Sequence, residues 1–354
     1  MSGVVAALAD AVRDAAIRHA GLRLRAGGTK DFYGQALTGE ALDLRPHAGI
    51  VAYDPTELVI TARCGTPLAE IEAALAEHRQ MLAFEPPRFG DGATLGGVVA
   101  AGLSGPRRAA AGAVRDFVLG VRMMDGRGDE LEFGGRVMKN VAGYDVSRLM
   151  AGSLGTLGCL LEVSLKVLPA PVAEATLKLE LPEGRAIDTL NAWAGKPLPI
   201  SATAFTDGDL GVRLSGAAAA VREARAKLGG ELVDPDRAAS FWTGIREQTD
   251  PFFAGDEPLW RLAVPSATPP LGLGGRLLVE WGGGLRWLKT GADARTIRER
   301  AARAGGHATL FRGGDKAVGV FQPLAPAVAT IHRRLKAEFD PHGVFNRGRL
   351  YADL

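Results

Sequence analysis

Three glycine-rich segments constrain this chain more than any other feature of its sequence. Glycine accounts for 47 of the 354 residues, where an average composition would give about 25. The excess gathers at residues 25–32 ("RAGGTKDF"), 90–105 ("GDGATLGGVVAAGLSG") and 151–158 ("AGSLGTLG"). Because glycine weakens both helices and strands, these clusters indicate loops whose bare backbone comes close to another group. They do not recur at a long fixed period, which argues against a solenoid.

The composition is that of a soluble protein. The chain is 47% hydrophobic and 23% charged with a net charge of +2, and its length suggests two domains. No block of Lys and Arg interleaved with aromatic residues appears, which argues against a nucleic-acid partner. Asp10, Arg13, Asp14 and Arg18 interrupt the apolar N-terminal run, so this run predicts an amphipathic helix rather than a signal peptide. No stretch reaches the roughly 18 uncharged apolar residues of a membrane span. We therefore expect a cytoplasmic protein.

The cysteine content limits the redox chemistry of the chain. Cys64 and Cys159 are its only cysteines, and an iron–sulfur cluster takes four thiolates in its usual form. No clustered spacing of His, Asp or Glu predicts a metal site either. We therefore expect no metal.

A change in composition near Pro169 and Pro171 marks a domain boundary. We expect a nucleotide-binding domain at 1–172, a cap domain of alternating strands and helices at 173–325, and a C-terminal segment at 326–354 that returns to the first domain. The fold class expected from this order is α+β.

Local signals place a few elements within these domains. Thr66 is predicted to cap a helix that starts at Pro67 and ends near residue 77. Residues 117–135 predict a hairpin, and 202–214 predict a strand.

The common phosphate-binding signatures are absent, but two of the glycine loops suit a pyrophosphate. There is no G-x-G-x-x-G between a strand and a helix, and no G-x-x-x-x-G-K-[ST]. In the first loop, Gly27 and Gly28 follow a strand and can turn N–H groups outward, with the Thr29 hydroxyl as a further donor. In the second loop, Thr94 can cap a helix whose first turn holds Gly96-Gly97, which is a typical anion site.

The third loop suits a different part of a ligand. Ser153 and Thr156 place hydroxyl groups between glycines, an arrangement that fits a flat heterocycle lying against backbone. For any one of the three loops, a tight turn or close packing is the simpler explanation. Taken together, the three loops indicate a ligand of the size of a flavin.

These segments are similar to those of a known family. "RAGGTKDF", "GATLGGVVAAGLSG" and "GYDVSRLMAGSLGTLGCLLEVSLKV" resemble successive FAD-contacting segments of the PCMH-type (vanillyl-alcohol-oxidase-like) flavoproteins, as does the passage "DPTELVITARCGTPLAEIEAAL". Within that family, "AAGLSGPRR" and "VMKNVAGYDVSRLMAGS" look most like an FAD-binding subunit of bacterial glycolate oxidase. The resemblance covers about residues 20–170 and resumes at "FDPHGVFNRGRL".

The resemblance implies a PCMH-type two-subdomain FAD-binding fold with an α+β cap and FAD extended across the first domain. The residues that it places near the pyrophosphate are Arg25, Ala26, Gly27, Gly28, Thr29, Thr94, Gly96, Gly97, Gly102, Ser104 and Gly105. Those that it places near the ribityl chain and ring are Gly152, Ser153, Gly155, Thr156 and Gly158. Val163 would lie at the adenine end, and Asn346 in the turn that returns to the flavin. Many relatives attach FAD through a His at the position of Thr29, so the expected FAD is non-covalent.

The catalytic pattern of the family is incomplete here. Catalytic relatives carry Ser-Glu-Gly in the third loop, where this chain has Ser-Leu-Gly, and a His- and Asn-rich motif in the cap, where it has "GGHATLFRGGD". His307 and Arg312 are the candidates for a base and a carboxylate clamp, although each is more simply a structural residue. His332, Arg333 and His342 are further candidates with the same alternative.

Residues near the third loop are also candidates for contact with the cofactor. Lys139, Asn140, Tyr144 and Asp145 flank the helix that precedes this loop, a segment that lies near the cofactor in the family. Capping and turn roles explain them equally, and we do not expect them to be catalysts.

Three functions stay open from the sequence. The first is an FAD-binding subunit that acts with a catalytic flavoprotein subunit and an iron–sulfur subunit of glycolate oxidase. In that case the hydride step belongs to the partner, and a peripheral position at the inner membrane, through the complex, stays open. The second is a self-sufficient FAD-dependent 2-hydroxy-acid dehydrogenase. The third is a non-catalytic scaffold.

Overall fold

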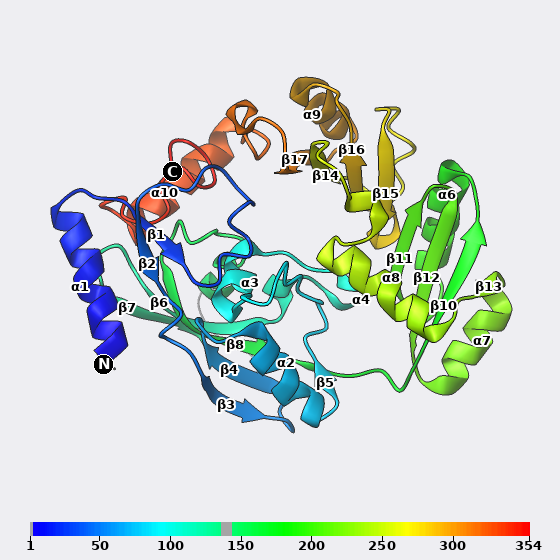
Figure 1. Ribbon diagram of the computed structural model, residues 1–354, viewed down its shortest axis with the longest axis horizontal. Helices are drawn as coiled ribbons and strands as arrows, with labels where there is room; N and C mark the ends of the chain where they lie inside the picture. The colour runs from blue at the N-terminus through cyan, green and yellow to red at the C-terminus, as the bar shows by residue number, and fades with distance from the viewer. Residues whose placement is uncertain (1–2, 136–143) are drawn as a thin grey trace. The chain divides into compact units, whose positions relative to one another are not determined.

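The computed structural model describes residues 3–135 and 144–354 and divides into two compact units (Figure 1). Unit 1 comprises Met1–Leu103, Ala113–Pro169 and Pro323–Leu354, and unit 2 comprises Ser104–Gly112 and Ala170–Gln322. Both boundaries that flank the expected cap fall within three residues of the predicted positions. The short excursion of Ser104–Gly112 into unit 2 is a feature that the sequence did not suggest.

Unit 1 is built on a five-stranded antiparallel sheet with the order β3-β4-β8-β6-β7. The strands are β3 (Ile50–Asp54), β4 (Val59–Arg63), β6 (Val118–Met124), β7 (Glu130–Gly134) and β8 (Cys159–Lys166). The central strand β8 is buried along most of its length, as its run of apolar residues predicts. The predicted hairpin at 117–135 is confirmed as β6 and β7.

Unit 1 also contains a parallel pair of strands. β1 (Leu22–Arg25) pairs with β2 (Glu40–Asp43), and Leu22 also forms a parallel bridge with Phe345 near the C-terminus. Helix α1 (Gly3–Ile17) packs its apolar face against Leu22 and Phe345. The C-terminal segment is thereby built into the same core as the N-terminal helix.

Unit 1 also contains further helices and one more pair of short strands, β5 and β9. They are α2 (Leu68–Glu77), β5 (Gln80–Met81), α3 (Leu95–Ala101), the 3₁₀ helix Val114–Asp116, α5 (Val146–Leu149), β9 (Leu168–Pro169) and α10 (Pro326–Phe339). The predicted Thr94 cap of α3 is confirmed, since its side chain accepts a hydrogen bond from the N–H of Gly97. The predicted Thr66 cap is wrong. The Thr66 hydroxyl instead accepts from Gly49 N at 2.9 Å and donates to Arg63 O at 2.6 Å, while α2 starts after Pro67 without a side-chain cap.

Unit 2 is built on an eight-stranded antiparallel sheet with the order β13-β10-β12-β11-β15-β16-β14-β17. The strands are β10 (Ala173–Glu180), β11 (Ile200–Thr206), β12 (Asp209–Gly216), β13 (Glu231–Leu232), β14 (Leu259–Ala263), β15 (Arg276–Glu280), β16 (Leu285–Lys289) and β17 (His307–Arg312). The single strand predicted at 202–214 is two strands, β11 and β12. Asp207 and Gly208, with φ of 51° and 91°, form the turn between them, and Asp-Gly is typical of such hairpins.

Helices cover the two faces of this sheet unequally (Figure 1). The helices are α4 (Arg108–Ala111), α6 (Glu183–Ala194), α7 (Ala218–Leu228), α8 (Pro235–Glu247) and α9 (Ala294–Arg303). The apolar sides of α6 and α7 pack on one half of one face, and α9 packs on strands of the other half. Trp242 of α8 packs with Ala202 and Ala204 of β11. The predicted α+β class is confirmed in both units. Within the described residues, no helix combines the length and apolarity that crossing a membrane requires.

Candidate functional site

A cleft in unit 1 brings the three glycine loops and the C-terminal turn together. The space between its walls, open mouth included, is about 800 Å³, within the usual range of small-molecule sites. The predicted cofactor residues that line it are Arg25, Ala26, Gly27, Gly28, Thr29, Thr94, Gly96, Gly97, Gly155, Gly158 and Asn346. Three loops far apart in sequence therefore contribute to one cavity.

The remaining predicted cofactor residues do not line this cleft. Val163 is fully buried in β8 between Ala62 and Val121. Ser104 and Gly105 belong to unit 2. The others in this group are Gly102, Gly152, Ser153 and Thr156. Their contacts with FAD stay predictions.

The first loop carries backbone donors that the protein does not use. Among the described residues, the N–H groups of Gly27, Gly28 and Thr29 have no hydrogen-bond partner. The carbonyl of Gly28 accepts from Asp31 N at 3.1 Å, which closes a turn around Thr29. A Cβ on Gly28 would lie 2.6 Å from Nη2 of Arg25, so this guanidinium lies against the turn. Successive free N–H groups beside a cation make an anion-binding concavity.

The second loop differs, because most of its donors are engaged. Leu95 N donates to Thr66 O at 3.0 Å and Gly96 N to Cys64 O at 2.8 Å, while Gly97 N makes a longer bond of 3.4 Å to the Thr94 hydroxyl. The first turn of α3 therefore has few N–H groups left for a phosphate. Its role is to form a wall of the cleft.

The walls of the cleft are in close backbone contact. A Cβ built on Gly27 would overlap the carbonyl oxygen of Gly92, and one on Gly96 would lie 2.8 Å from Cβ of Cys64. Burial raises the pKa of the Cys64 thiol well above its usual value. Cys64 is therefore a neutral part of the wall rather than a nucleophile.

The third loop is held by its own hydrogen bonds and by α3. Gly152 N donates to Val99 O at 3.0 Å and Leu154 N to Ala100 O at 2.8 Å. The hydroxyl of Thr156 donates to Ser153 O at 2.8 Å. A Cβ on Gly102 would lie 2.7 Å from Cα of Gly152. The donors predicted to read a heterocycle are thus largely engaged, and the loop packs tightly on α3.

Asn346 connects the third loop to β1. Its backbone N donates to Leu22 O at 2.9 Å, its Oδ1 accepts from Leu24 N at 2.9 Å, and its Nδ2 donates to Leu154 O at 2.6 Å. The residue has a φ of 40°, a region that Asn tolerates better than most residues. A Cβ on Gly155 would lie 2.7 Å from Nδ2 of Asn346, so this contact requires glycine.

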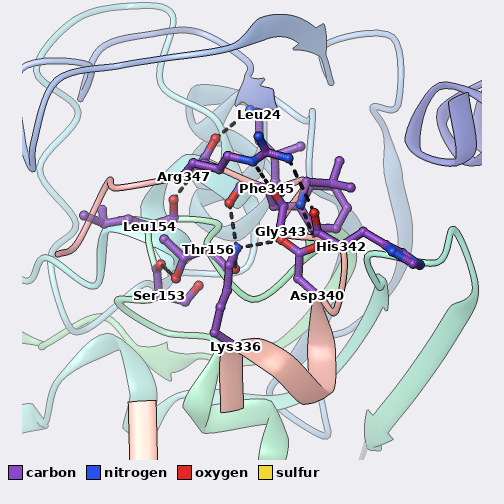
Figure 2. Close-up of polar contacts among 12 residues, drawn as sticks. Leu24, Ser153, Leu154, Thr156, Lys336, Asp340, His342, Gly343, Phe345 and Arg347 are labelled. Atoms are coloured by element: carbon purple, nitrogen blue, oxygen red, sulfur yellow. Dashed lines mark hydrogen bonds and ion pairs between the residues drawn. The ribbon is translucent and has the colours of Figure 1, made fainter. Parts of the chain in front are cut away.

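A buried ion pair anchors the same region from α10 (Figure 2). Lys336 Nζ donates to Asp340 Oδ2 at 2.6 Å, to Thr156 O at 2.7 Å and to Phe345 O at 2.8 Å. The carboxylate of Asp340 also accepts from Val344 N and Phe345 N, each at 2.8 Å. Burial lowers the pKa of Lys336, and the charge of Asp340 opposes that shift. Sequence reasoning missed this pair, which only the path of the C-terminal turn brings against the third loop.

Arg349 is the other residue that sequence reasoning missed. Its guanidinium is buried and donates to the carbonyl oxygens of Lys30, Asp31, Tyr33 and Gln35. Burial lowers the pKa of Arg349 to about 10. Arg349 also lines the cleft and fixes the end of the first loop and the residues that follow it. Its position in "NRGRL" carries no signal that predicts this role.

The residues of the cleft fit a flavin dinucleotide. The free N–H groups of the first loop suit a pyrophosphate. Arg25, Lys30 and Arg349 outnumber Asp31, which pairs with Arg25 at 3.0 Å, so the lining keeps a positive charge. Thr29 offers no imidazole for a covalent bond to a flavin. Residues 27–29 would hold the pyrophosphate, and the third loop would form the opposite wall.

The catalytic candidates of the sequence are dispersed. His307 and Arg312 lie at opposite ends of β17, about 16 Å apart along a strand. His332 contacts the ring of Tyr351, and Arg333 forms an exposed ion pair with Asp353.

The candidates that precede the third loop give no catalytic arrangement among the described residues. Asp145 caps α5 through Arg148 N, and Tyr144 is almost fully exposed. Lys139 and Asn140 lie outside the described residues.

Comparisons with known proteins indicate the same cofactor, FAD. A family model described as an FAD binding domain matches residues 3–134. The glycolate oxidase subunit GlcE of Escherichia coli (strain K12) is 51% identical over 348 residues, which cover 98% of this chain and 97% of that protein. The glycolate oxidase subunit GlcD of Bacillus subtilis (strain 168) is 40% identical over 84 residues, 24% of this chain and 18% of that protein. Among solved structures, an alkyldihydroxyacetonephosphate synthase has a TM-score of 0.66 at 15% identity over 96% of this chain and 73% of its own, which is a likeness of fold alone.

Proposed function

The chain belongs to the family of the glycolate oxidase subunit GlcE, a family of FAD-linked oxidoreductases, and from this premise we propose that it is the FAD-binding subunit of a glycolate-oxidising complex. Membership confirms the resemblance drawn from the glycine loops. The substrate, glycolate, is taken from the names of the relatives.

The observation that carries the cofactor proposal is the run of unpaired N–H groups in the first loop. Gly27, Gly28 and Thr29 would donate to the pyrophosphate of FAD, and Arg25 would balance its charge. Asn346 and Arg349 keep β1 and the segment after the loop in position. The absence of an imidazole at residue 29 supports a non-covalent cofactor.

The proposed division of labour follows from what this chain lacks in its sequence. When bound, FAD supplies a two-electron acceptor. Leu154 stands where catalytic relatives carry Glu, so we assign the hydride step to a partner flavoprotein of the GlcD type. The two cysteines are both buried, and two thiolates do not complete a cluster of the usual four. An iron–sulfur partner is therefore proposed to receive the electrons.

An absorbance spectrum of the purified chain tests the proposal. Flavin bands that persist through desalting after addition of FAD are the expected result. Co-expression with a GlcD-type subunit and an iron–sulfur subunit should then give a complex that reduces an acceptor with glycolate. A chain that stays colourless alone and in the complex would contradict the proposal and leave a scaffold.

A second candidate is a self-sufficient 2-hydroxy-acid dehydrogenase. It is favoured by a histidine and an arginine that share one sheet face in unit 2, His307 and Arg261. Bleaching of the flavin bands by glycolate under anaerobic conditions, without any partner, would support this candidate over the first.

A further inference from the structure

One face of the eight-stranded sheet of unit 2 carries two side chains of complementary chemistry. In the register of β14 and β17, Arg261 is opposite Thr309 and Ala263 is opposite His307. Side chains two residues apart in a strand share a face, so Arg261 lies on the same face as Ala263 and its partner His307. Arg261 and His307 are therefore diagonal neighbours on that face. Such neighbours lie about 7–8 Å apart, a gap that a molecule of two or three carbons can bridge.

A tryptophan brings a second cation to the same place. The guanidinium carbon of Arg261 lies 5.3 Å from the ring centroid of Trp281, and that of Arg108 lies 4.3 Å from it. The indole N–H donates to Gly105 O at 3.1 Å, which ties the excursion of Ser104–Gly112 to this side of the sheet. The guanidinium groups of Arg108 and Arg261 therefore both lie close to the Trp281 ring.

The hydrogen bonding of Arg261 differs from that of other stacked arginines of unit 2. Arg276 stacks on Phe252 but pairs with Asp207 at 3.5 Å, and Arg298 stacks on Trp260 but donates to two carbonyl groups. Arg261 is half-buried, and within the described part of the chain its side chain makes no hydrogen bond or ion pair. Its planar fork of N–H donors remains available to a ligand.

The charge of Arg261 also acts on the histidine. Partial burial of the ring, and after it the charge of Arg261, lowers the pKa of His307. The imidazole is therefore neutral near pH 7 and keeps a nitrogen that accepts hydrogen bonds.

We propose that Arg261, assisted by Arg108, binds the carboxylate of a small 2-hydroxy acid, with His307 accepting a hydrogen bond from its hydroxyl. The carboxylate is inferred from the two guanidinium groups, which bind carboxylates through paired hydrogen bonds. The 2-hydroxy acid class rests on the second candidate of the proposed function, in which this chain itself binds the substrate. Arg261 thus replaces Arg312 as the clamp beside His307.

Calorimetric titration of the full chain, loaded with FAD, tests the site. Glycolate is the probe, and glycolamide, which has an amide in place of the carboxylate, is the matched control ligand. We expect wild type to bind glycolate and not glycolamide. Arg261→Met should weaken glycolate binding at least about tenfold, the loss expected for one charge-assisted pair. Arg276→Met, which removes a stacked arginine with its own partner, should bind like wild type.

The outcomes separate this inference from the proposed function. Glycolate binding that is unchanged in Arg261→Met, or absent in the FAD-loaded wild type, would overturn the inference without bearing on FAD. Loss of FAD retention, read from the absorbance spectrum, would instead contradict the proposed function. If Arg261→Met does not fold, Arg261→Lys keeps the charge but loses the planar fork, and weaker glycolate binding with an unchanged melting temperature is expected.

Discussion

The first and third loops are both rich in glycine, but they use their backbone in opposite ways. Within the described chain, the first loop leaves the N–H groups of residues 27–29 unpaired, and these residues line the cleft. In the third loop, the N–H groups of Gly152 and Leu154 donate hydrogen bonds to carbonyl groups of α3, and Thr156 O accepts one from Lys336. Glycine in the first loop therefore exposes donors, and in the third it permits close packing. The number of glycines alone therefore does not distinguish a loop that binds a ligand from a loop that packs against the protein.

The largest expected effect comes from the anchor of the third loop. Asp340→Ala should lower the free energy of unfolding by about 3–5 kcal/mol, because it leaves the Lys336 ammonium buried without its counter-ion. It also removes the acceptor of Val344 N and Phe345 N. Urea titration of the cofactor-free chain measures the change. The control is Asp353→Ala, which removes the exposed ion-pair partner of Arg333. Arg333 lies on α10, as Lys336 does, and this control should change stability by less than about 1 kcal/mol.

Gly155→Ala should have the next largest effect, again on stability. The residue has a φ of 70°, and a Cβ would lie 2.7 Å from Nδ2 of Asn346. The cost should be about 2–3 kcal/mol from backbone strain and lost packing. Gly195→Ala, where a Cβ meets no atom within 4 Å, should be nearly neutral. If Gly155→Ala weakened FAD binding and left the cofactor-free chain as stable as before, the third loop would be a ligand loop and the comparison would fail.

Thr29→Pro should affect the cofactor rather than the fold. Thr29 occupies the second position of the turn closed by Asp31 N and Gly28 O, where proline is favoured, so one N–H is lost while the turn is kept. We expect FAD to bind about tenfold more weakly, as measured by fluorescence titration, with little change in melting temperature. Thr29→Ala keeps the N–H and loses only the hydroxyl, so it should bind within about threefold of wild type. Equal affinities of the two variants would show that the N–H is not used.

The smallest effect is a pH dependence that belongs to neither loop. His47 is buried and its Nε2 has no hydrogen-bond partner among the described residues. Burial, followed by the charge of Arg63, lowers the pKa of His47. The unfolded chain then binds more protons below its own His pKa, so stability is lost as the pH falls from about 7.5 toward 5.5. His47→Asn should show a shallower loss in urea titrations, and His19→Asn, at an exposed position, should match wild type. Parallel slopes for all three chains would contradict this assignment.

Local signals predicted a good part of the fold. The Thr94 cap and the hairpin of β6 and β7 each depend on residues close in sequence. The failures were local as well. Thr66 lies where a helix cap is typical, yet its hydroxyl accepts from Gly49 N, 17 residues away in sequence, and donates to Arg63 O. The Asp207-Gly208 dipeptide is itself a typical hairpin signal, and it lies inside the single strand predicted at 202–214.

The sequence by itself determined the α+β class and the family, because these follow from residue type and short-range order, and it indicated both the first and the second loop for a pyrophosphate. Only the tertiary structure separates the two loops, since the second has most of its N–H groups engaged. Only the tertiary structure decided which side chains hold the cleft. Lys336 reaches Thr156 O in the third loop, and Arg349 reaches carbonyl groups of the first loop, although both come from the C-terminal part of the chain. In unit 2, strand pairing likewise makes Arg261 and His307 neighbours on one sheet face. Such contacts depend on the path of the chain in space. Burial then turns ordinary charged residues into anchors, because a charge removed from water is stable only where partners surround it.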